Sequence, residues 1–149
     1  MSLKGQITTH KKHQTYQLVA ELQHERQAVW SMYCHVAQQM PFSANQKIRK
    51  QLSRFSEILI DYVSLGHFGV FEHLFQDADS HDPALSFAKA IYPALSSTTD
   101  AAVSFNDKYE NSTTTNTIFN DLKQDLSALG ESLAKRIDLE DRLCELMLQ

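Results

Sequence analysis

The first residues that could do chemistry are Glu21 and His24, whose Glu-x-x-His spacing puts both side chains on one side of a helix. A di-metal carboxylate centre in a helical bundle needs two such pairs, together with a glutamate from each of the other two helices. The sequence lacks the second pair, because Glu72 and His73 are adjacent and would point about 100° apart on a helix. We therefore predict that the chain holds no metal.

Motifs for nucleophilic catalysis and phosphate binding are also missing from the sequence. It contains no Gly-x-Ser-x-Gly elbow and no glycine-rich phosphate loop. Its cysteines, Cys34 and Cys144, have no Cys-x-x-Cys spacing and fall among apolar residues, where a free cysteine acts as a small hydrophobe. These absences predict a protein that is not an enzyme and needs no cofactor.

Charged residues occupy positions of the last helical pattern that should face a core. Glu140 falls on the apolar stripe, Arg136 lies one turn before it, and Asp141 follows it. Burying such groups costs on the order of several kcal/mol unless they pair with one another. Two interpretations stay open: a buried polar network that fixes the register of the helices, or a pocket for a small ligand that regulates the protein. The candidate members are Tyr62, His67, Glu72, Arg136, Glu140 and Asp141.

A second cluster combines carboxylates with apolar side chains near residue 60. If Tyr62 and its stripe neighbours face the core, the cluster falls on or beside the outer face of its helix. Exposed apolar anchors beside charges are typical of a protein-binding patch. The alternative is that the apolar members complete the core near Gly66. The candidate partner-binding residues are Glu57, Asp61, Leu65 and Phe68.

Helices must position both clusters, because the composition leaves little room for other elements. The chain has 149 residues, and its 4 glycines and 3 prolines are too few to separate the many short strands of a sandwich or barrel. Apolar residues instead recur at spacings of three and four almost throughout. A chain of this length buries roughly 70% of its unfolded surface, so a core needs no disulfide. We predict an all-α protein with a single domain over residues 1–149.

Four amphipathic patterns follow one another along the chain. They cover residues 14–40, 48–74, 88–109 and 119–147, and short polar segments connect them. Short connections favour packing of consecutive helices side by side, so we predict an up-and-down antiparallel four-helix bundle. Residues 1–13 are expected to form a flexible arm.

Glycine and proline mark the expected irregularities within these helices. Gly66 predicts a kink or a short break in the second helix. Pro93 predicts a bend in the third, because proline removes a backbone donor and crowds the preceding turn. Asp82 followed by Pro83 is typical of a helix start, with aspartate as the cap and proline at the first helical position.

Charge and hydropathy restrict the partners. The chain carries 14 Lys and Arg against 18 Asp and Glu, a net charge of −4, whereas sequence-independent binding to nucleic acid needs the opposite sign. No apolar run approaches the roughly 20 residues that span a bilayer. The first residues show no apolar segment followed by a small-residue cleavage site. We therefore expect a cytoplasmic protein that contacts neither nucleic acid nor membrane directly.

Five segments of the chain form a recognisable set, which is LIDYVSLGHF at 59–68, VFE at 70–72, IYP at 91–93, LGESLAKR at 129–136 and LEDRL at 139–143. Within them, Asp-Tyr-x-Ser-x-Gly-His-Phe together with Leu-Glu-Asp-x-Leu is fairly specific. In their order and spacing these segments resemble the Rsd/AlgQ family of bacterial anti-sigma regulators. The helical framework that they share covers nearly the whole chain.

The resemblance implies a helical protein that binds the C-terminal, promoter-reading domain of the primary sigma factor, sigma seventy. Binding would keep that domain from the RNA polymerase core and from promoter DNA, and so regulate transcription in stationary phase. Some family members have other protein partners, so other regulatory proteins are expected as well. In this interpretation Asp61 contacts a basic residue of the sigma domain, and Leu65 and Phe68 are the apolar anchors beside it.

Overall fold

A computed structural model describes residues 3–43, 45–110 and 119–149, with side chains from Lys12 onward and that of Asp77 left out. Every element in this part of the chain is helical, which confirms the predicted all-α class. The elements are α1 (Leu3–Ala37), α2 (Gln46–Ser64), the π-helix η1 (Leu65–Phe71), α3 (Glu72–Asp77), α4 (Pro83–Tyr109) and α6 (Leu122–Met147).

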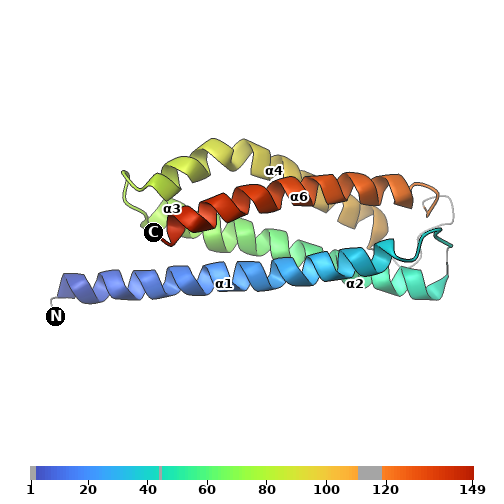
Figure 1. The fold of residues 1–149 in the computed structure, drawn as a ribbon, viewed down its shortest axis with the longest axis horizontal. Helices are drawn as coiled ribbons and strands as arrows, with labels where there is room; N and C mark the ends of the chain where they lie inside the picture. Colours follow the sequence, from blue (N-terminus) through green and yellow to red (C-terminus); the bar gives the residue numbers. More distant parts are fainter. Residues whose placement is uncertain (1–2, 44, 111–118) are drawn as a thin grey trace.

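The helices form the predicted up-and-down antiparallel four-helix bundle, in which α2, η1 and α3 act as one continuous helix. Figure 1 shows α1 running in one direction, α2 to α3 returning, α4 running forward again and α6 returning beside it. Each helix packs against the next one along the chain, and α1 also contacts α6. The start of α1 and the end of α6 therefore lie at the same end of the bundle (Figure 1).

Helix α1 is longer than its apolar pattern predicts, because it begins at Leu3 rather than near residue 14. Residues 3–13 contain no proline, the residue that interrupts a helix most strongly. Figure 1 shows the first turns of α1 extending beyond the rest of the bundle. The flexibility of the arm at residues 1–13 stays a prediction, and residues 1–2 lie outside the described part.

Side-chain caps define where two of the helices begin. The Asp82 side chain accepts a hydrogen bond of 2.9 Å from the Ala84 backbone N–H, with Pro83 at the first helical position, as the sequence predicts. The Asn45 side chain accepts a similar bond, also 2.9 Å, from the Ile48 N–H at the start of α2. These caps satisfy backbone donors that have no partner inside the helix.

The irregularity expected near Gly66 is a π-helix and not a break. The backbone passes from α2 through η1 into α3 without leaving the helical region. A π-helical turn holds extra backbone compared with an α-helical turn, so it changes the direction in which all later side chains point. Pro93 lies inside α4, which is visibly arched in Figure 1.

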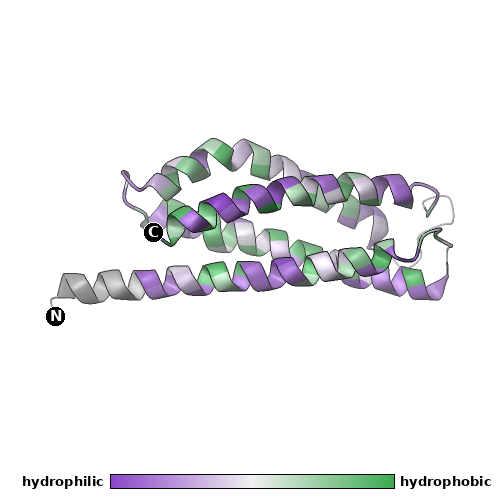
Figure 2. Ribbon diagram, in the orientation of Figure 1, coloured by the Kyte–Doolittle hydropathy of each residue, from purple (hydrophilic) through white to green (hydrophobic). Residues whose placement is uncertain are grey.

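The core runs the length of the bundle and receives side chains from all four helices. Figure 2 shows hydrophilic and hydrophobic residues alternating along α1, α4 and α6, as amphipathic helices require. Cys144 is buried as expected, whereas Cys34 is exposed, contrary to its apolar sequence context. The largest fully buried apolar side chains are Leu22, Ile48, Leu52, Phe55, Leu59, Tyr62, Tyr109, Leu122, Leu133 and Leu143.

Candidate functional site

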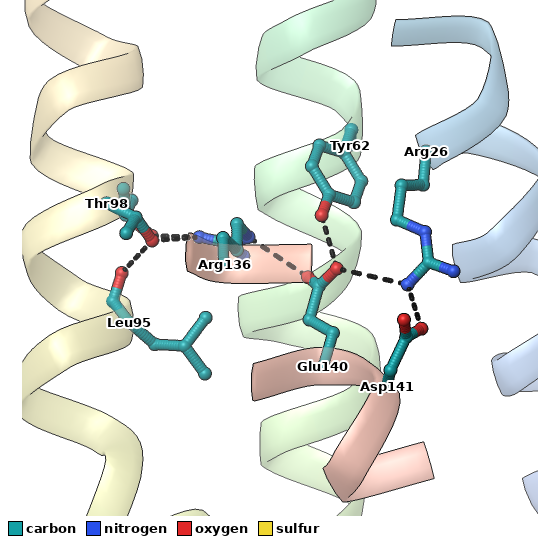
Figure 3. A network of polar contacts seen from close by, with 8 residues as sticks. Arg26, Tyr62, Leu95, Thr98, Arg136, Glu140 and Asp141 are labelled. Atoms are coloured by element: carbon teal, nitrogen blue, oxygen red, sulfur yellow. Dashed lines mark hydrogen bonds and ion pairs between the residues drawn. The ribbon is translucent and has the colours of Figure 1, made fainter. Parts of the chain in front are cut away.

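A carboxylate lies at the centre of a buried polar network. Glu140 on α6 is only 2% exposed, and it accepts hydrogen bonds from the Tyr62 hydroxyl of α2 and from Arg136 Nε at 3.0 Å (Figure 3). Arg136 and Glu140 are one turn apart on the same helix, the spacing at which opposite charges meet. The predicted pairing of the two misplaced charges is therefore confirmed.

Arg136 is 1% exposed, and its guanidinium finds further partners on α4. Its Nη1 donates to the Thr98 hydroxyl at 3.2 Å and to the Thr99 hydroxyl at 2.7 Å. The Thr98 hydroxyl donates in turn to the Leu95 carbonyl at 2.7 Å (Figure 3). The guanidinium carbon also lies 5.3 Å from the centre of the Tyr62 ring, within cation–π range. The buried cation is thus paired, hydrogen-bonded and covered by an aromatic face.

Arg26 connects the network to α1. Its Nη1 lies 2.8 Å from Asp141 Oδ1 and 3.8 Å from Glu140 Oε1 (Figure 3). The network therefore joins all four helices of the bundle and balances two guanidinium groups with two carboxylates. Such a balance is what makes burial of the charges tolerable.

Burial changes the protonation behaviour of the two groups at the centre. It raises the pKa of the Glu140 carboxyl, although Arg136 and the Tyr62 hydroxyl act in the opposite direction. Burial, and then the neighbouring Glu140 carboxylate, raise the pKa of the Tyr62 hydroxyl. Tyr62 consequently keeps its proton and remains a donor to Glu140.

Gly66 lets the network pack against the π-helix. A Cβ atom at this position would lie 2.6 Å from Arg136 Nη2, which is closer than real Cβ contacts allow. Any larger residue would have to displace the guanidinium. The buried network and the irregular segment η1 are therefore parts of one arrangement.

The structure joins four of the six predicted network residues, Tyr62, Arg136, Glu140 and Asp141, of which Asp141 is 50% exposed and forms the outer end, and it leaves out two. Glu72 lines the surface hollow beside Phe68 instead, so its assignment to the network is wrong. His67 is half-buried and lies with its ring 4.8 Å from that of Phe68, centre to centre, rather than beside Glu140. Both follow Gly66 in the chain, where the π-helix changes the direction of the side chains.

Sequence reasoning missed Arg26, Thr98 and Thr99 as members of the network. Arg26 sits four residues after Leu22 and three before Val29, so it lies on the apolar stripe of α1. Thr98 likewise falls on the stripe of α4. A polar residue on a buried stripe is the sequence signal that marks both Arg26 and Thr98.

The four candidate partner-binding residues lie on the outward side of α2 and η1. Glu57 and Asp61 are exposed, and Phe68 is 62% exposed, so Phe68 does not complete the core. Leu65 is half-buried and packs against the core, so it contributes to the core and also keeps part of its side chain at the surface. Glu57 Oε2 also lies 3.3 Å from Arg54 Nη1, in an ion pair whose two side chains are both exposed.

Carboxylates line both flanks of this outward side. Towards α4, an open groove is lined by Glu57 and Asp61 together with Glu110. Towards α1, a shallow hollow holds Phe68 beside Glu21 and Glu72. The exposed phenylalanine therefore sits in acidic surroundings.

Glu25 adds a carboxylate that sequence reasoning did not select. Burial, and then the negative charges of Asp61 and Glu21, raise the pKa of its carboxyl. Its Oε2 atom is buried and has no hydrogen-bond partner among the described residues. The effect of Asp61 on Glu25 shows that α1 lies close enough to the face that carries Asp61 for the two carboxyl groups to interact.

Neither a metal site of three or more ligands nor a membrane-spanning helix is found in the described ranges. Within them, no group of three or more His, Cys, Asp or Glu side chains is placed to hold a metal ion. None of the helices in those ranges is long and apolar enough to cross a membrane. The described part of the chain is thus a helical bundle whose outward face carries carboxylates and an exposed phenylalanine ring.

The chain belongs to the Rsd/AlgQ family, described as regulators of the RNA polymerase sigma(70) subunit, whose family model matches residues 1–148. It is similar to a protein called "Regulator of sigma D" from Yersinia enterocolitica, with 29% identity over 132 residues, 87% of this chain and 79% of the relative. A protein of the same name from Enterobacter sp. is 33% identical over 99 residues, 66% of this chain and 59% of the relative. No solved structure matches the chain.

Proposed function

We propose that this protein is a cytoplasmic anti-sigma regulator that binds the C-terminal, promoter-reading domain of the primary sigma factor. Binding keeps that domain from the RNA polymerase core and from promoter DNA, and so lowers transcription from its promoters in stationary phase. The protein acts by occupying a surface of its partner, without catalysis, cofactor or direct contact with DNA. Membership of a family of sigma(70) regulators supports this proposal.

The observation that carries the proposal is the exposed ring of Phe68 among carboxylates. An apolar side chain 62% open to solvent gains free energy when a partner covers it. Asp61 and Glu72 lie along the same outward side, and both are exposed. A promoter-reading helix-turn-helix domain presents arginine and lysine side chains, so its DNA-binding surface complements this face.

The two kinds of side chain contribute differently to binding. Loss of an apolar anchor at the desolvated centre of an interface commonly costs about 2 kcal/mol, or roughly thirtyfold in affinity. Loss of an exposed charge at the rim mainly slows association and weakens the salt dependence. Phe68→Ala should therefore reduce affinity more than Glu57→Ala does.

Titration of the full chain against purified full-length primary sigma factor tests the proposal. Phe68→Ala and Asp61→Ala should weaken binding, whereas Val103→Ala, an exposed apolar residue on α4, serves as the matched control. A sigma factor that lacks its C-terminal domain should fail to bind. Folded Phe68→Ala and Asp61→Ala proteins that bind with unchanged affinity would remove this face from the interface.

The buried network supports the bundle in this proposal and is not a ligand pocket. Arg136, Glu140 and Tyr62 fill the space between the helices and are partnered with one another. A ligand would have to displace these internal contacts. We infer that the network fixes the register of the helices and holds η1 in the shape that presents Phe68.

A further inference from the structure

Aromatic rings continue from Phe68 across the bundle to α4. The His67 ring lies 4.8 Å from the Phe68 ring and 6.2 Å from the Tyr92 ring, centre to centre. Tyr92 in turn lies 6.0 Å from Phe75 and 5.9 Å from Phe71. These five residues form an unbroken series of ring contacts, called here the aromatic surface.

Much of the aromatic surface faces solvent. Phe75 is 43% exposed and Tyr92 is 36% exposed, in addition to Phe68. Single exposed apolar side chains are ordinary, but three exposed aromatic rings in one connected series are typical of an interaction surface. Tyrosine and phenylalanine are also enriched at the centres of protein interfaces.

The size of a stable interface makes the aromatic surface relevant to the proposed partner. A standard complex buries about 800 Å² on each partner. The four candidate residues of α2 and η1 supply only on the order of a few hundred Å², because Leu65 is already half-buried. A stable complex therefore needs further contact area that is continuous with Phe68.

Position and charge indicate that a single partner covers both the candidate residues of α2 and η1 and the aromatic surface. Phe68 belongs to the candidate face and to the aromatic surface, so a domain seated on Phe68 also approaches His67 and Tyr92. Glu72 is exposed and lies near Phe68 in the same shallow hollow, three residues before Phe75. A carboxylate beside exposed rings suits a partner whose arginine and lysine side chains can pair with the acid and stack on the aromatic faces.

We propose that the partner-binding face extends from Asp61 and Phe68 over His67 to Tyr92 and Phe75, and that one basic domain of the sigma factor covers all of it. This inference rests on the proposed function. It assigns binding roles to Tyr92 on α4 and Phe75 on α3, which lie outside the candidate residues of α2 and η1. Tyr92 is the inner anchor because three other rings surround it.

Affinity measurements with the full chain and full-length primary sigma factor test this extension. Tyr92→Ala should lower affinity by about tenfold or more, and Phe75→Ala by a smaller factor. Tyr92→Phe keeps the ring and should bind like the unaltered protein. Val103→Ala is the control on the same helix, and a thermal melt of each variant separates lost binding from lost folding.

The outcomes distinguish this inference from the proposed function. If Tyr92→Ala and Phe75→Ala bind normally while Phe68→Ala is weakened, the extension is wrong and the proposed function stands. If all three bind normally, the proposed face fails together with its extension. If Tyr92→Ala changes the sedimentation of the free protein but not its affinity for sigma, the aromatic surface is an interface between two copies of this chain, and the inference is overturned.

Discussion

The two sides of the segment from Asp61 to Phe68 differ in how their charged and aromatic groups are placed: those on one side are buried and paired, and those on the other are exposed. On the inward side, Tyr62 and Gly66 contact a network whose central carboxylate, Glu140, is buried and paired. On the outward side, the Asp61 carboxylate and the Phe68 ring face solvent. Adjacent residues of a helix point about 100° apart, so Tyr62 faces the buried network whereas its neighbour Asp61 faces solvent.

Stability and recognition are therefore divided between the two sides of one helix. The inward groups have their partners inside the chain, so a substitution there should change the free energy of unfolding. The outward groups have few partners inside the chain, as the 62% exposure of Phe68 indicates. Substitutions on that side should change binding and leave stability nearly unaltered.

The largest effect is expected from Glu140→Ala. Removal of this carboxylate leaves Arg136 buried without its ion pair, which should destabilise the protein by about 3 kcal/mol. Urea denaturation followed by circular dichroism measures the change. Glu145→Ala on the same helix removes an exposed carboxylate and should cost less than about 0.5 kcal/mol. Equal stability of the two variants would contradict the inward role of Glu140.

A smaller loss is expected from Gly66→Ala, because the new methyl group would collide with the Arg136 guanidinium. Crowding of this kind costs about 1 to 3 kcal/mol, partly offset by the better helix propensity of alanine. Gly69→Ala is the matched control, since its methyl group would meet the ends of two flexible side chains, 2.9 Å from Leu65 Cδ1 and 3.5 Å from Leu18 Cδ2. The midpoint of urea unfolding should fall for Gly66→Ala and stay constant or rise for Gly69→Ala. A urea midpoint that falls for Gly69→Ala and not for Gly66→Ala would show that the packing of Arg136 on Gly66 does not stabilise the protein.

A gain in stability is expected from Glu25→Gln at neutral pH. The raised pKa of Glu25 means that its ionised form is disfavoured in the folded protein. The stability that this group contributes is present below its ordinary pKa of 4.5 and is lost as the pH rises through the folded value. Removal of the charge should add about 0.5 kcal/mol at pH 7, the size of a like-charge pair on a helix.

Thermal unfolding at pH 4 and pH 7 checks the Glu25 prediction. The advantage of Glu25→Gln should disappear at the lower pH, where the carboxyl of the unaltered protein is protonated. Binding to the sigma factor should weaken in the same variant, because a basic partner loses a carboxylate. A variant that is less stable at pH 7 would show that the charge of Glu25 supports the fold.

The smallest effect on folding is expected from Phe68→Ala. Because this ring is 62% exposed, its loss should change the free energy of unfolding by less than about 0.5 kcal/mol. The same variant should bind the sigma factor roughly thirtyfold more weakly. Chemical denaturation and a binding titration on one preparation provide both numbers. A large loss of stability would contradict the assignment of Phe68 to the outward side and indicate that its ring supports the core.

The sequence by itself determined the four helical segments, apart from the first turns of α1 and the π-helical form of η1, and the need for one ion pair. Apolar spacing defines the helices, and Asp82 with Pro83 marks the start of α4, because these are local properties of the chain. The pairing of Arg136 with Glu140 is also local, since the two lie one turn apart on a stripe that must be buried.

Only the tertiary structure decided which other groups share the network and which residues face solvent. Arg26 and Thr98 reach Arg136 and Glu140 from α1 and α4, across distances in sequence that no spacing rule covers. His67 and Glu72 leave the network because η1 replaces α-helical turns and changes the direction of every side chain after Gly66. The close approach of the Arg136 guanidinium to Gly66 likewise joins α6 to η1, and it exists only when the bundle is assembled.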